Sequence, residues 1–284
     1  MGELVFVGLG LADERQMTLR GLDEVKRADV VFAEFYTSPV PTDILPRLAA
    51  LIQRQPVVLE RAQLEEDGGR TVLEAAKTSK VVLLVPGDPL IATTHLSLRL
   101  AAFKQGISTR VANAPSILTA AIGASGLQNN RFGPSFTVPS TSATLPDSLY
   151  DLAKDNLVRG LHTLVFLDVG TEGKAPMTIK DAVRRLLKAE QSRRENVFRN
   201  DRLAVGLARL GYDQPIVKAD LLESLMRCDF GDAPHCLVLP GRLHFVEAEA
   251  LECFAGAPRE ALVKAAQKED ALRTSWETRT PQGF

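Results

Sequence analysis

The sequence predicts an α/β protein made of two domains of the βαβ type. Short runs of β-branched and aliphatic residues alternate with amphipathic segments long enough for helices, and this alternation indicates a parallel sheet. The pattern lapses once, at residues 123–134, where small and polar residues suit a linker. At 284 residues, 45% hydrophobic and 24% charged, the chain is long and apolar enough to form a core in each half.

The first half, residues 1–128, is expected to form an N-terminal α/β domain with five strands. The expected strands are residues 4–7, 30–33, 56–59, 81–85 and 108–112. A helix is expected at residues 94–105, with Leu96, Leu100 and Phe103 on the side that covers the sheet. Gly106 follows where a left-handed residue commonly ends a helix.

The second half, residues 129–257, is expected to form a second α/β domain with some antiparallel pairing. Its expected strands are residues 136–139, 163–168, 203–210 and 236–240, and its expected helices are residues 146–159, 178–190, 221–226 and 245–254. Residues 258–284 are rich in charged and polar side chains, which predicts a short surface helix followed by a polar tail.

Composition excludes several classes of protein. The 34 Lys and Arg residues nearly cancel the 35 Asp and Glu residues, so no strong field attracts nucleic acid or an anionic membrane. The three cysteines lack Cys-x-x-Cys spacing, which argues against a disulfide framework and a zinc site and fits a reducing cytoplasm. No run of about 18 apolar residues predicts a membrane span. The histidines have no metal spacing, and no hydrolase motif occurs.

Gly8-Leu9-Gly10-Leu11 directly follows the first expected strand, where glycines let a ligand approach the backbone. A dinucleotide-binding fold is one interpretation, because Glu34 ends the second strand where a ribose-binding acid would lie. Asp13 replaces the third glycine of that fingerprint, however, and the helical pattern begins only at about Thr18. Both features argue against nicotinamide binding.

Two further turns follow expected strands. Pro86-Gly87-Asp88-Pro89 comes after residues 81–85, and Asp88 is either a ligand-binding carboxylate or the cap of a tight turn. Asn113-Ala114-Pro115-Ser116-Ile117 comes after residues 108–112, where Ser116 caps a helix with or without a ligand at its N–H groups.

The second half offers weaker signals. Leu167 and Leu210 lie at the ends of expected strands, and His235 enters the last one, but a lone histidine is more often structural than catalytic. Four arginines, at positions 184, 185, 193 and 194, indicate either a solvated helix face or a contact for an acidic partner.

The motifs occur in an order that resembles the diphthine synthase family over nearly the whole chain, to about residue 251. The resemblance rests on these stretches: Phe6 to Leu11, Thr18 to Gly21, Glu34 to Ser38, Gly87 to Pro89, Ala92 to His95, Asn113 to Ile117, Gly126 to Gln128, Arg131 to Gly133, Pro146 to Ser148, His162 to Leu164, Gly206 to Arg209, Pro234 to His235 and Pro240 to Phe245. An ordered series of this length is far more specific than any one motif.

The resemblance implies a class III methyltransferase, related to the tetrapyrrole methylases, with two α/β domains, S-adenosyl-L-methionine in the cleft between them and paired subunits. The cofactor-binding residues carried over are Leu11, Asp88, Ile91, Ser116, Ile117, Leu167, Leu210 and His235. The family commonly has Phe-Gly where this chain has Leu90 and Ile91. A backbone contact at Ile91 therefore requires a conformation that does not need positive φ.

The function that the resemblance implies is trimethylation of an amino group on translation elongation factor 2. That group belongs to a 3-amino-3-carboxypropyl histidine, and the products are diphthine and S-adenosyl-L-homocysteine. The chain would act as a cytoplasmic homodimer, with no nucleic acid or membrane partner and no assigned catalytic residue. The alternatives are a tetrapyrrole-precursor methylase of the same fold and a nucleotide-binding module without catalysis.

Overall fold

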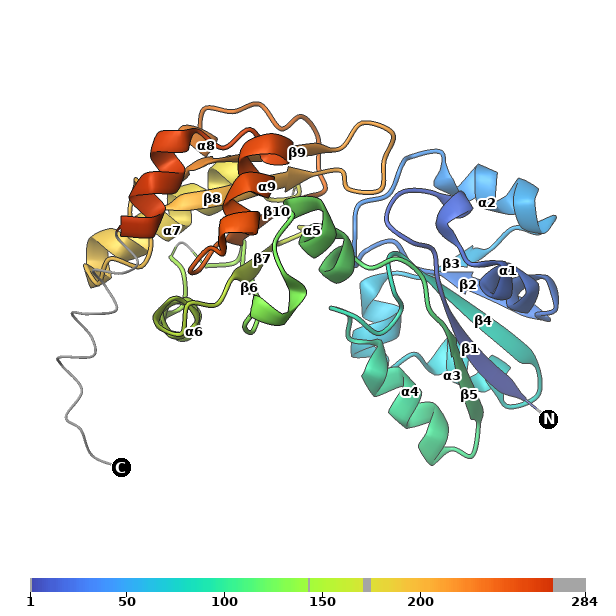
Figure 1. Cartoon of the computed structure of the whole chain (residues 1–284). Helices are drawn as coiled ribbons and strands as arrows, with labels where there is room; N and C mark the ends of the chain where they lie inside the picture. Colours follow the sequence, from blue (N-terminus) through green and yellow to red (C-terminus); the bar gives the residue numbers. More distant parts are fainter. Residues whose placement is uncertain (1, 143, 171–174, 268–284) are drawn as a thin grey trace. The chain divides into compact units, whose positions relative to one another are not determined.

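The computed structural model describes residues 2–142, 144–170 and 175–267, and its internal contacts divide the chain into two units (Figure 1). Unit 1 comprises Met1–Ala120 together with Gly211–Asp213, and unit 2 comprises Ala121–Leu210 together with the chain from Gln214 onward. Each unit contains one five-stranded sheet with helices against it, as the alternation of strand and helix patterns predicts.

The sheet of unit 1 is entirely parallel among its described strands. Its strands are β1 (Glu3–Gly8), β2 (Val30–Ala33), β3 (Val57–Val58), β4 (Lys80–Val85) and β5 (Ser108–Ala112). Their order is β3-β2-β4-β1-β5, with Glu3 of β1 opposite Lys80 on one side and Ser108 on the other. All five strands were predicted from the aliphatic runs. Because β1 lies between β4 and β5, the loops that follow these three strands meet at one edge.

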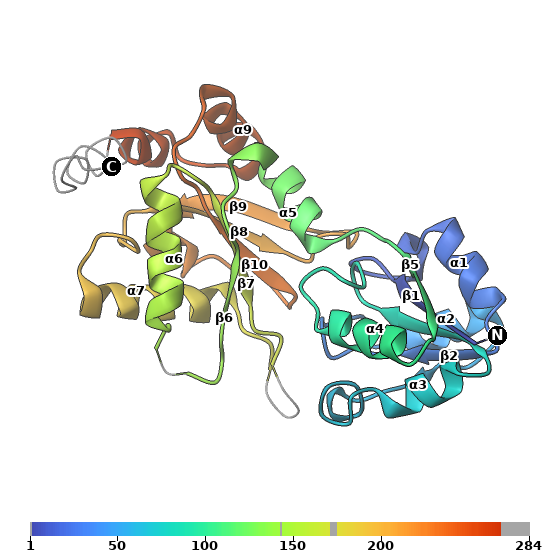
Figure 2. The same ribbon diagram turned by 90° about the horizontal axis from the view of Figure 1, so that it is seen from below.

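Helices cover both faces of this sheet (Figure 2). Val5 and Val7 of β1 pack with residues of α1 (Leu19–Lys26) and α2 (Ile44–Ile52). Leu4 and Phe6 point the other way and pack with residues of α3 (Arg70–Ala76) and α4 (His95–Lys104). Alternate residues of a strand point to opposite faces, so a strand covered on both sides reads as a continuous apolar run.

The orientation of α4 corrects one prediction. Leu96, Leu100 and Phe103 do share one side of the helix, but they are 56%, 52% and 75% exposed instead of packing on the sheet. The buried face carries Leu98 and Ala102, and Gly106 has φ of +74°, as predicted for the residue after the helix. The prediction assigned the side with more large apolar residues to the sheet, whereas the side that packs on the sheet is the one that carries Leu98 and Ala102.

We expect Leu98→Ala to lower the free energy of unfolding by about 2–5 kcal/mol, because it removes a buried side chain from a packed core. The matched change on the exposed stripe, Leu100→Ala, is expected to cost about 0.5 kcal/mol or less. Urea unfolding of both variants measures the difference. Equal losses would show that α4 packs by the other face.

Unit 2 has a mixed sheet, in agreement with the predicted antiparallel pairing. Its strands are β6 (Phe136–Val138), β7 (Thr163–Leu167), β8 (Leu203–Ala208), β9 (Ile216–Leu221) and β10 (His235–Leu239), in the order β6-β7-β10-β8-β9. Among its described strands, only β6 and β7 pair in parallel. Strand β9 was not predicted: it is an edge strand with Lys218 and Asp220 among its residues, and only Ala219 is fully buried. Its apolar pattern is therefore weak.

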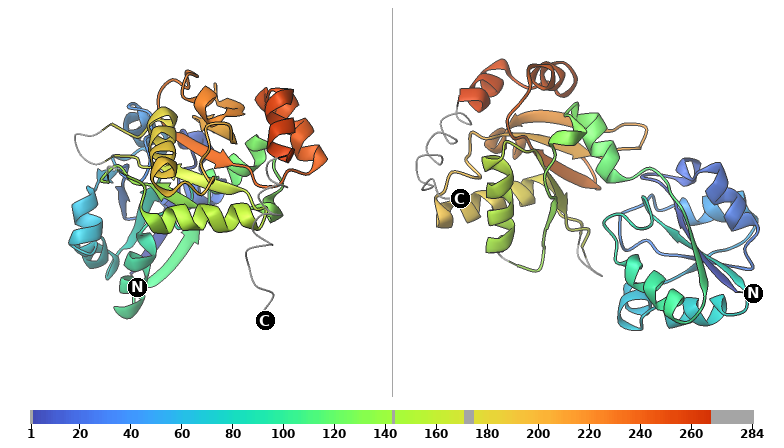
Figure 3. Two further views of the ribbon diagram at one scale, coloured as in Figure 1. Left: turned by 90° about the vertical axis from the view of Figure 1, so that its left-hand side faces the viewer. Right: turned by 60° about the horizontal axis from the view of Figure 1, so that its bottom comes forward.

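One face of the second sheet packs against α6 (Asp147–Val158), α7 (Ile179–Arg193) and α8 (Leu222–Leu225) around a core that includes Tyr150 and Leu186. The C-terminal part of α5 (Ile117–Ser125), which belongs to unit 2 from Ala121 on, lies next to α9 (Phe245–Ala255) (Figure 3). The end of α5 packs so closely on α9 that a Cβ on Gly126 would lie 2.8 Å from that of Ala250.

Residues 259–267 form the short helix that composition predicts, and it buries Ala261 and Ala265. The polar tail expected beyond it lies outside the described residues from position 268. Within the described ranges, no helix combines the length and the apolar character needed to cross a bilayer.

Candidate functional site

The loops after β1 and β4 are joined by backbone hydrogen bonds at the carboxyl edge of the first sheet. Gly10 N donates to Gly87 O at 3.2 Å, and Gly87 N donates to Gly10 O at 2.6 Å. Both glycines have positive φ, +80° and +69°, which other residues adopt only at a cost. The two Gly-containing motifs therefore form one structure, with the half-buried Leu11 directly after it.

Gly8 lies where three loops come closest together. A Cβ at this position would lie 2.5 Å from the carbonyl oxygen of Gly87 and 2.7 Å from the Cβ of Ala114. Neither neighbour is the end of a flexible side chain, so any side chain here would force the loops apart. The absence of a Cβ lets the backbones after β1, β4 and β5 approach one another.

Asp88 connects the loop after β4 to the loop after β5. Its side chain is 6% exposed, with Oδ1 accepting from Leu90 N at 3.2 Å and Oδ2 accepting from Asn113 Nδ2 at 2.8 Å. The expected turn cap is therefore present. A carboxylate has about four lone-pair positions, so Asp88 retains acceptor capacity for a ligand beside these two bonds.

Ser116 caps α5 as predicted. Its Oγ accepts from Leu118 N at 3.2 Å, and the residue is buried. Because the first N–H groups of a helix have no partners within the helix, Ser116 and Ile117 bring a donor-rich helix start to the same sheet edge.

The conformation at Ile91 permits a side chain there. Among the described non-glycine residues with positive φ, the one in this turn is Ala92, at +56°, and Ile91 is not one of them. Ile91 N donates to Asp88 O at 3.3 Å, and its side chain is 40% exposed. A backbone contact at Ile91 therefore needs no positive φ at that residue. The left-handed conformation occurs at Ala92 instead, at a cost of about 1–2 kcal/mol.

Glu34 does not have the role that a dinucleotide-binding fold requires. It is fully buried, and Oε2 accepts from Tyr36 N at 3.0 Å and Thr37 N at 3.1 Å. Oε1 accepts from Thr37 Oγ1 at 2.6 Å and lies 3.2 Å from His95 Nε2. A carboxylate committed to its own turn and to a buried histidine cannot also hold a ribose. Sequence reasoning missed the Glu34–His95 pair, because 61 positions separate the two residues.

The residues predicted in the second half meet at one edge of the second sheet. Strand β10 runs antiparallel between β7 and β8, so its first residue lies beside the last residues of both neighbours. His235 is opposite Ala208, and the pair Cys236–Phe166 places Leu167 beside His235. Leu210 lies two positions past Ala208. Strand direction alone therefore brings Leu167, Leu210 and His235 to one edge.

The imidazole of His235 has hydrogen-bonding groups that no described residue satisfies. Both ring nitrogens are buried, and neither makes a hydrogen bond of normal geometry within those residues. Burial lowers the pKa of the imidazole, although the carbonyl groups of residues 230–232 oppose the shift. A neutral imidazole offers one donor and one acceptor, which suits a polar ligand.

Two arginines of the candidate cluster make contacts elsewhere in unit 2. Arg185 donates to the carbonyls of Pro139, Ser140 and Ser142, and Arg193 pairs with Asp147, Asp151 and Glu195. These two members of the arginine cluster are thus structural cations. Over the ranges that the structure describes, no group of three or more His, Cys, Asp or Glu side chains is placed to hold a metal ion.

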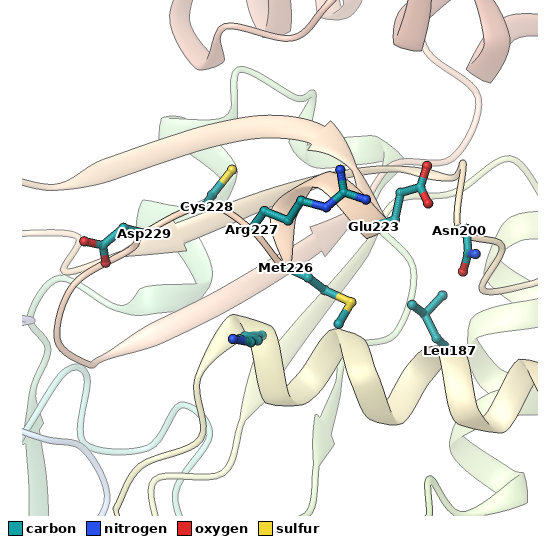
Figure 4. A pocket seen from close by; sticks show the side chains of 8 residues that line it. Leu187, Asn200, Glu223, Met226, Arg227, Cys228 and Asp229 are labelled. Carbon is teal, nitrogen blue, oxygen red and sulfur yellow. The ribbon is translucent and has the colours of Figure 1, made fainter.

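A separate open pocket of about 580 Å³ lies between α7 and the segment after α8 (Figure 4). Met226 points down toward α7 and Leu187, while Arg227 extends along the rim toward Glu223. The lining residues are Lys180, Leu187, Asn200, Glu223, Met226, Arg227, Cys228 and Asp229. No predicted ligand-binding residue is among them.

Comparison with known proteins identifies the class first. The model of the family described as Tetrapyrrole (Corrin/Porphyrin) Methylases matches residues 3–225. The chain has two α/β units, and the first carries glycine-rich and acidic turns at the ends of its strands. These features fit that class and define the chain as a methylase of this fold.

Relatives then identify the family. A diphthine synthase of Methanosarcina barkeri is 42% identical over 261 residues, 90% of this chain and 97% of the relative. That of Methanothermobacter thermautotrophicus is 42% identical over 257 residues, with the same coverage. A crystal structure of a diphthine synthase has a TM-score of 0.83 at 41% identity and covers 92% of this chain and 98% of that one. The chain belongs to the diphthine synthase family and is an S-adenosylmethionine-dependent methyltransferase.

Proposed function

We propose that this enzyme methylates the amino group of the 3-amino-3-carboxypropyl histidine of translation elongation factor 2 and forms diphthine in diphthamide biosynthesis. The observation that carries the proposal is the meeting of the turns at Gly8, Asp88 and Asn113 at one sheet edge. It occurs in a chain 42% identical to relatives named diphthine synthase.

The cofactor contacts that we propose are the eight residues carried over from the family: Leu11, Asp88, Ile91, Ser116, Ile117, Leu167, Leu210 and His235. S-adenosyl-L-methionine supplies a methyl group on a sulfonium. The residues present suit such a ligand, since Asp88 can accept hydrogen bonds from an amine or a hydroxyl and His235 has buried ring nitrogens to offer. The missing Cβ at Gly8 keeps the loop backbones close together.

The residues of the chain contribute mainly orientation. A nucleophilic amine must be neutral and aligned with the carbon that it attacks, and fixed geometry alone accounts for a large part of such rate enhancements. We assign no general base. Burial favours the neutral state of His235, so this side chain would add no positive charge to a site that holds a cationic sulfonium.

We also propose that the enzyme works in the cytoplasm as a homodimer. Support for the pairing comes from the resemblance to class III methyltransferases. Support for the cytoplasm comes from the cysteine content and from the nature of elongation factor 2 as a translation protein. Recognition of that partner must be local, because the net charge of the chain is only −1.

Transfer of labelled methyl groups from S-adenosyl-L-methionine to purified elongation factor 2 tests the proposal. We expect label only on the form that carries the aminocarboxypropyl histidine, and intact-mass measurement is expected to show three added methyl groups that mild alkali does not remove. Transfer to a tetrapyrrole precursor instead would establish the alternative methylase function. Cofactor binding without turnover on either substrate would favour a binding module.

A further inference from the structure

Gln16 bridges two segments of unit 1 with its side-chain amide. It ends the short 3-10 helix Glu14–Gln16, and its Oε1 accepts from Leu11 N at 2.7 Å. Its Nε2 donates to Gly211 O at 2.5 Å. Gly211 directly follows Leu210 in the chain and belongs to unit 1 by its contacts. One side chain therefore contacts the residue after Gly10 and the residue after Leu210.

Two glycines make room for this bridge. A Cβ on Gly10 would lie 2.4 Å from the Cβ of Gln16, and a Cβ on Gly211 would lie 2.8 Å from the Cβ of Leu11 and 3.0 Å from Gln16 Nε2. Both glycines have positive φ, +80° and +87°. The backbone on both sides of the amide is thus shaped around it, which distinguishes Gln16 from a surface glutamine with an incidental bond.

The bridge restricts how Leu11 can act. The N–H of Leu11 is already donated to Gln16, so a ligand can reach this residue only through its carbonyl oxygen or its side chain. The carbonyl oxygen of Gly211 accepts from the other end of the same amide, which helps to fix the Gly211–Tyr212 peptide, one residue past Leu210. Orientation of both residues therefore depends on the two ends of one primary amide.

We propose that Gln16 is a positioning residue of the cofactor site, acting through Leu11 and Gly211 without touching the reacting atoms. The inference rests on the proposed function, because it takes Leu11 and Leu210 as cofactor contacts. Only a neutral amide fills the role: its carbonyl end faces a donor, and its NH₂ end faces an acceptor.

Calorimetric titration with S-adenosyl-L-homocysteine, with kinetics alongside, tests Gln16→Ala and Gln16→Glu. We expect Gln16→Ala to weaken binding by roughly ten- to a hundredfold, since two hydrogen bonds that hold the site are lost. The KM for the methyl donor should rise by a similar factor, with a much smaller change in kcat. Gln63→Ala is the matched control, because Gln63 Oε1 also accepts a backbone N–H, that of Glu60 at 2.8 Å, outside the proposed site.

Gln16→Glu separates positioning from folding. The glutamate keeps the size of the side chain and can still accept a hydrogen bond from Leu11 N. At about pH 8, however, its ionised carboxylate has no proton to donate to Gly211 O, so two acceptor oxygens face each other. At about pH 5 a growing fraction of this carboxyl is protonated and can donate again. We therefore expect the affinity deficit relative to wild type to shrink as the pH falls from about 8 to about 5, with no such change in Gln63→Ala.

The inference is overturned if both Gln16 variants bind the product with unchanged affinity, or if the deficit of Gln16→Glu is the same at both pH values. Gln16→Glu stays informative if Gln16→Ala fails to fold. Asp88→Ala, run in parallel, tests the cofactor site itself. If Asp88→Ala loses binding while both Gln16 variants bind normally, only the proposed role of Gln16 is ruled out. If Asp88→Ala binds normally, the proposed cofactor site itself is contradicted.

Discussion

Glu247→Ala is expected to lower the free energy of unfolding by about 3–5 kcal/mol, the cost of removing one partner from a buried charged network. Glu247 is fully buried, and its carboxylate lies 3.0 Å from His162 Nε2 and 3.2 Å from Arg131 Nη1. It also accepts the backbone N–H groups of Gln128 at 2.8 Å and His244 at 2.7 Å. Its loss leaves four donors without their acceptor and loosens the start of α9.

Urea unfolding measures this loss, with Glu252→Ala as the control on the same helix. Within the described ranges Glu252 pairs with the exposed Arg259, so its removal should cost about 0.5 kcal/mol or less. A loss below about 1 kcal/mol for Glu247→Ala would mean that water replaces the carboxylate and that the network is not structural.

The same network should make the wild-type protein sensitive to acid. Burial raises the pKa of Glu247, but the N–H groups of His244 and Gln128 together with His162 outweigh it, and the net pKa lies below 4.5. Burial also holds the pKa of His162 below 6.5. Because the pKa of each group is lower in the folded state than in the unfolded state, the unfolded state takes up the proton at a higher pH than the folded state does. Stability from His162 is therefore lost below about pH 6.5, and stability from Glu247 below about pH 4.5.

Asp88→Ala is expected to weaken binding of S-adenosyl-L-homocysteine by roughly ten- to a hundredfold, as calorimetry would measure. The change removes a charged acceptor, worth about 1.5–3 kcal/mol in its hydrogen bonds, from a turn at the sheet edge. It also breaks the link to Asn113 that joins the loops after β4 and β5.

Asp29→Ala provides the matched control, because Asp29 Oδ2 accepts from Lys80 N at 2.7 Å at the opposite end of the same sheet. That variant should bind the product with wild-type affinity. Normal binding by Asp88→Ala would remove this carboxylate from the site, whereas weak binding by both variants would point to a general loss of structure.

The residues that sequence analysis identifies well are those governed by local patterns. The aliphatic runs of β1 and β4 predict buried parallel strands, and strand direction then places the turns at Gly8, Asp88 and Asn113 at one edge. Ser116 could be predicted as a cap because capping depends on neighbouring positions only. The family resemblance added the residues of unit 2, whose local signals are weak.

The features that sequence analysis misses depend on contacts between distant positions. The exposed side of α4 cannot be told from the buried side, because Leu96 and Leu98 are equally apolar and only the packed sheet selects between them. His95 lies 61 positions from its partner Glu34, and Gly211 lies 195 positions from its partner Gln16. Strand β9 forms because it pairs with β8. Its own sequence, with two charged residues among six, does not predict a strand.

Backbone hydrogen exchange with and without S-adenosyl-L-homocysteine tests most directly where the cofactor binds. Slower exchange on binding is expected in peptides that cover Gly8 to Leu11, Pro86 to Ile91 and Asn113 to Ile117, and in those that contain Leu167, Leu210 and His235. Peptides that line the separate pocket, from Glu223 to Asp229, are expected to exchange at unchanged rates. Protection confined to that pocket, with no effect at the strand ends, would contradict the proposed cofactor site.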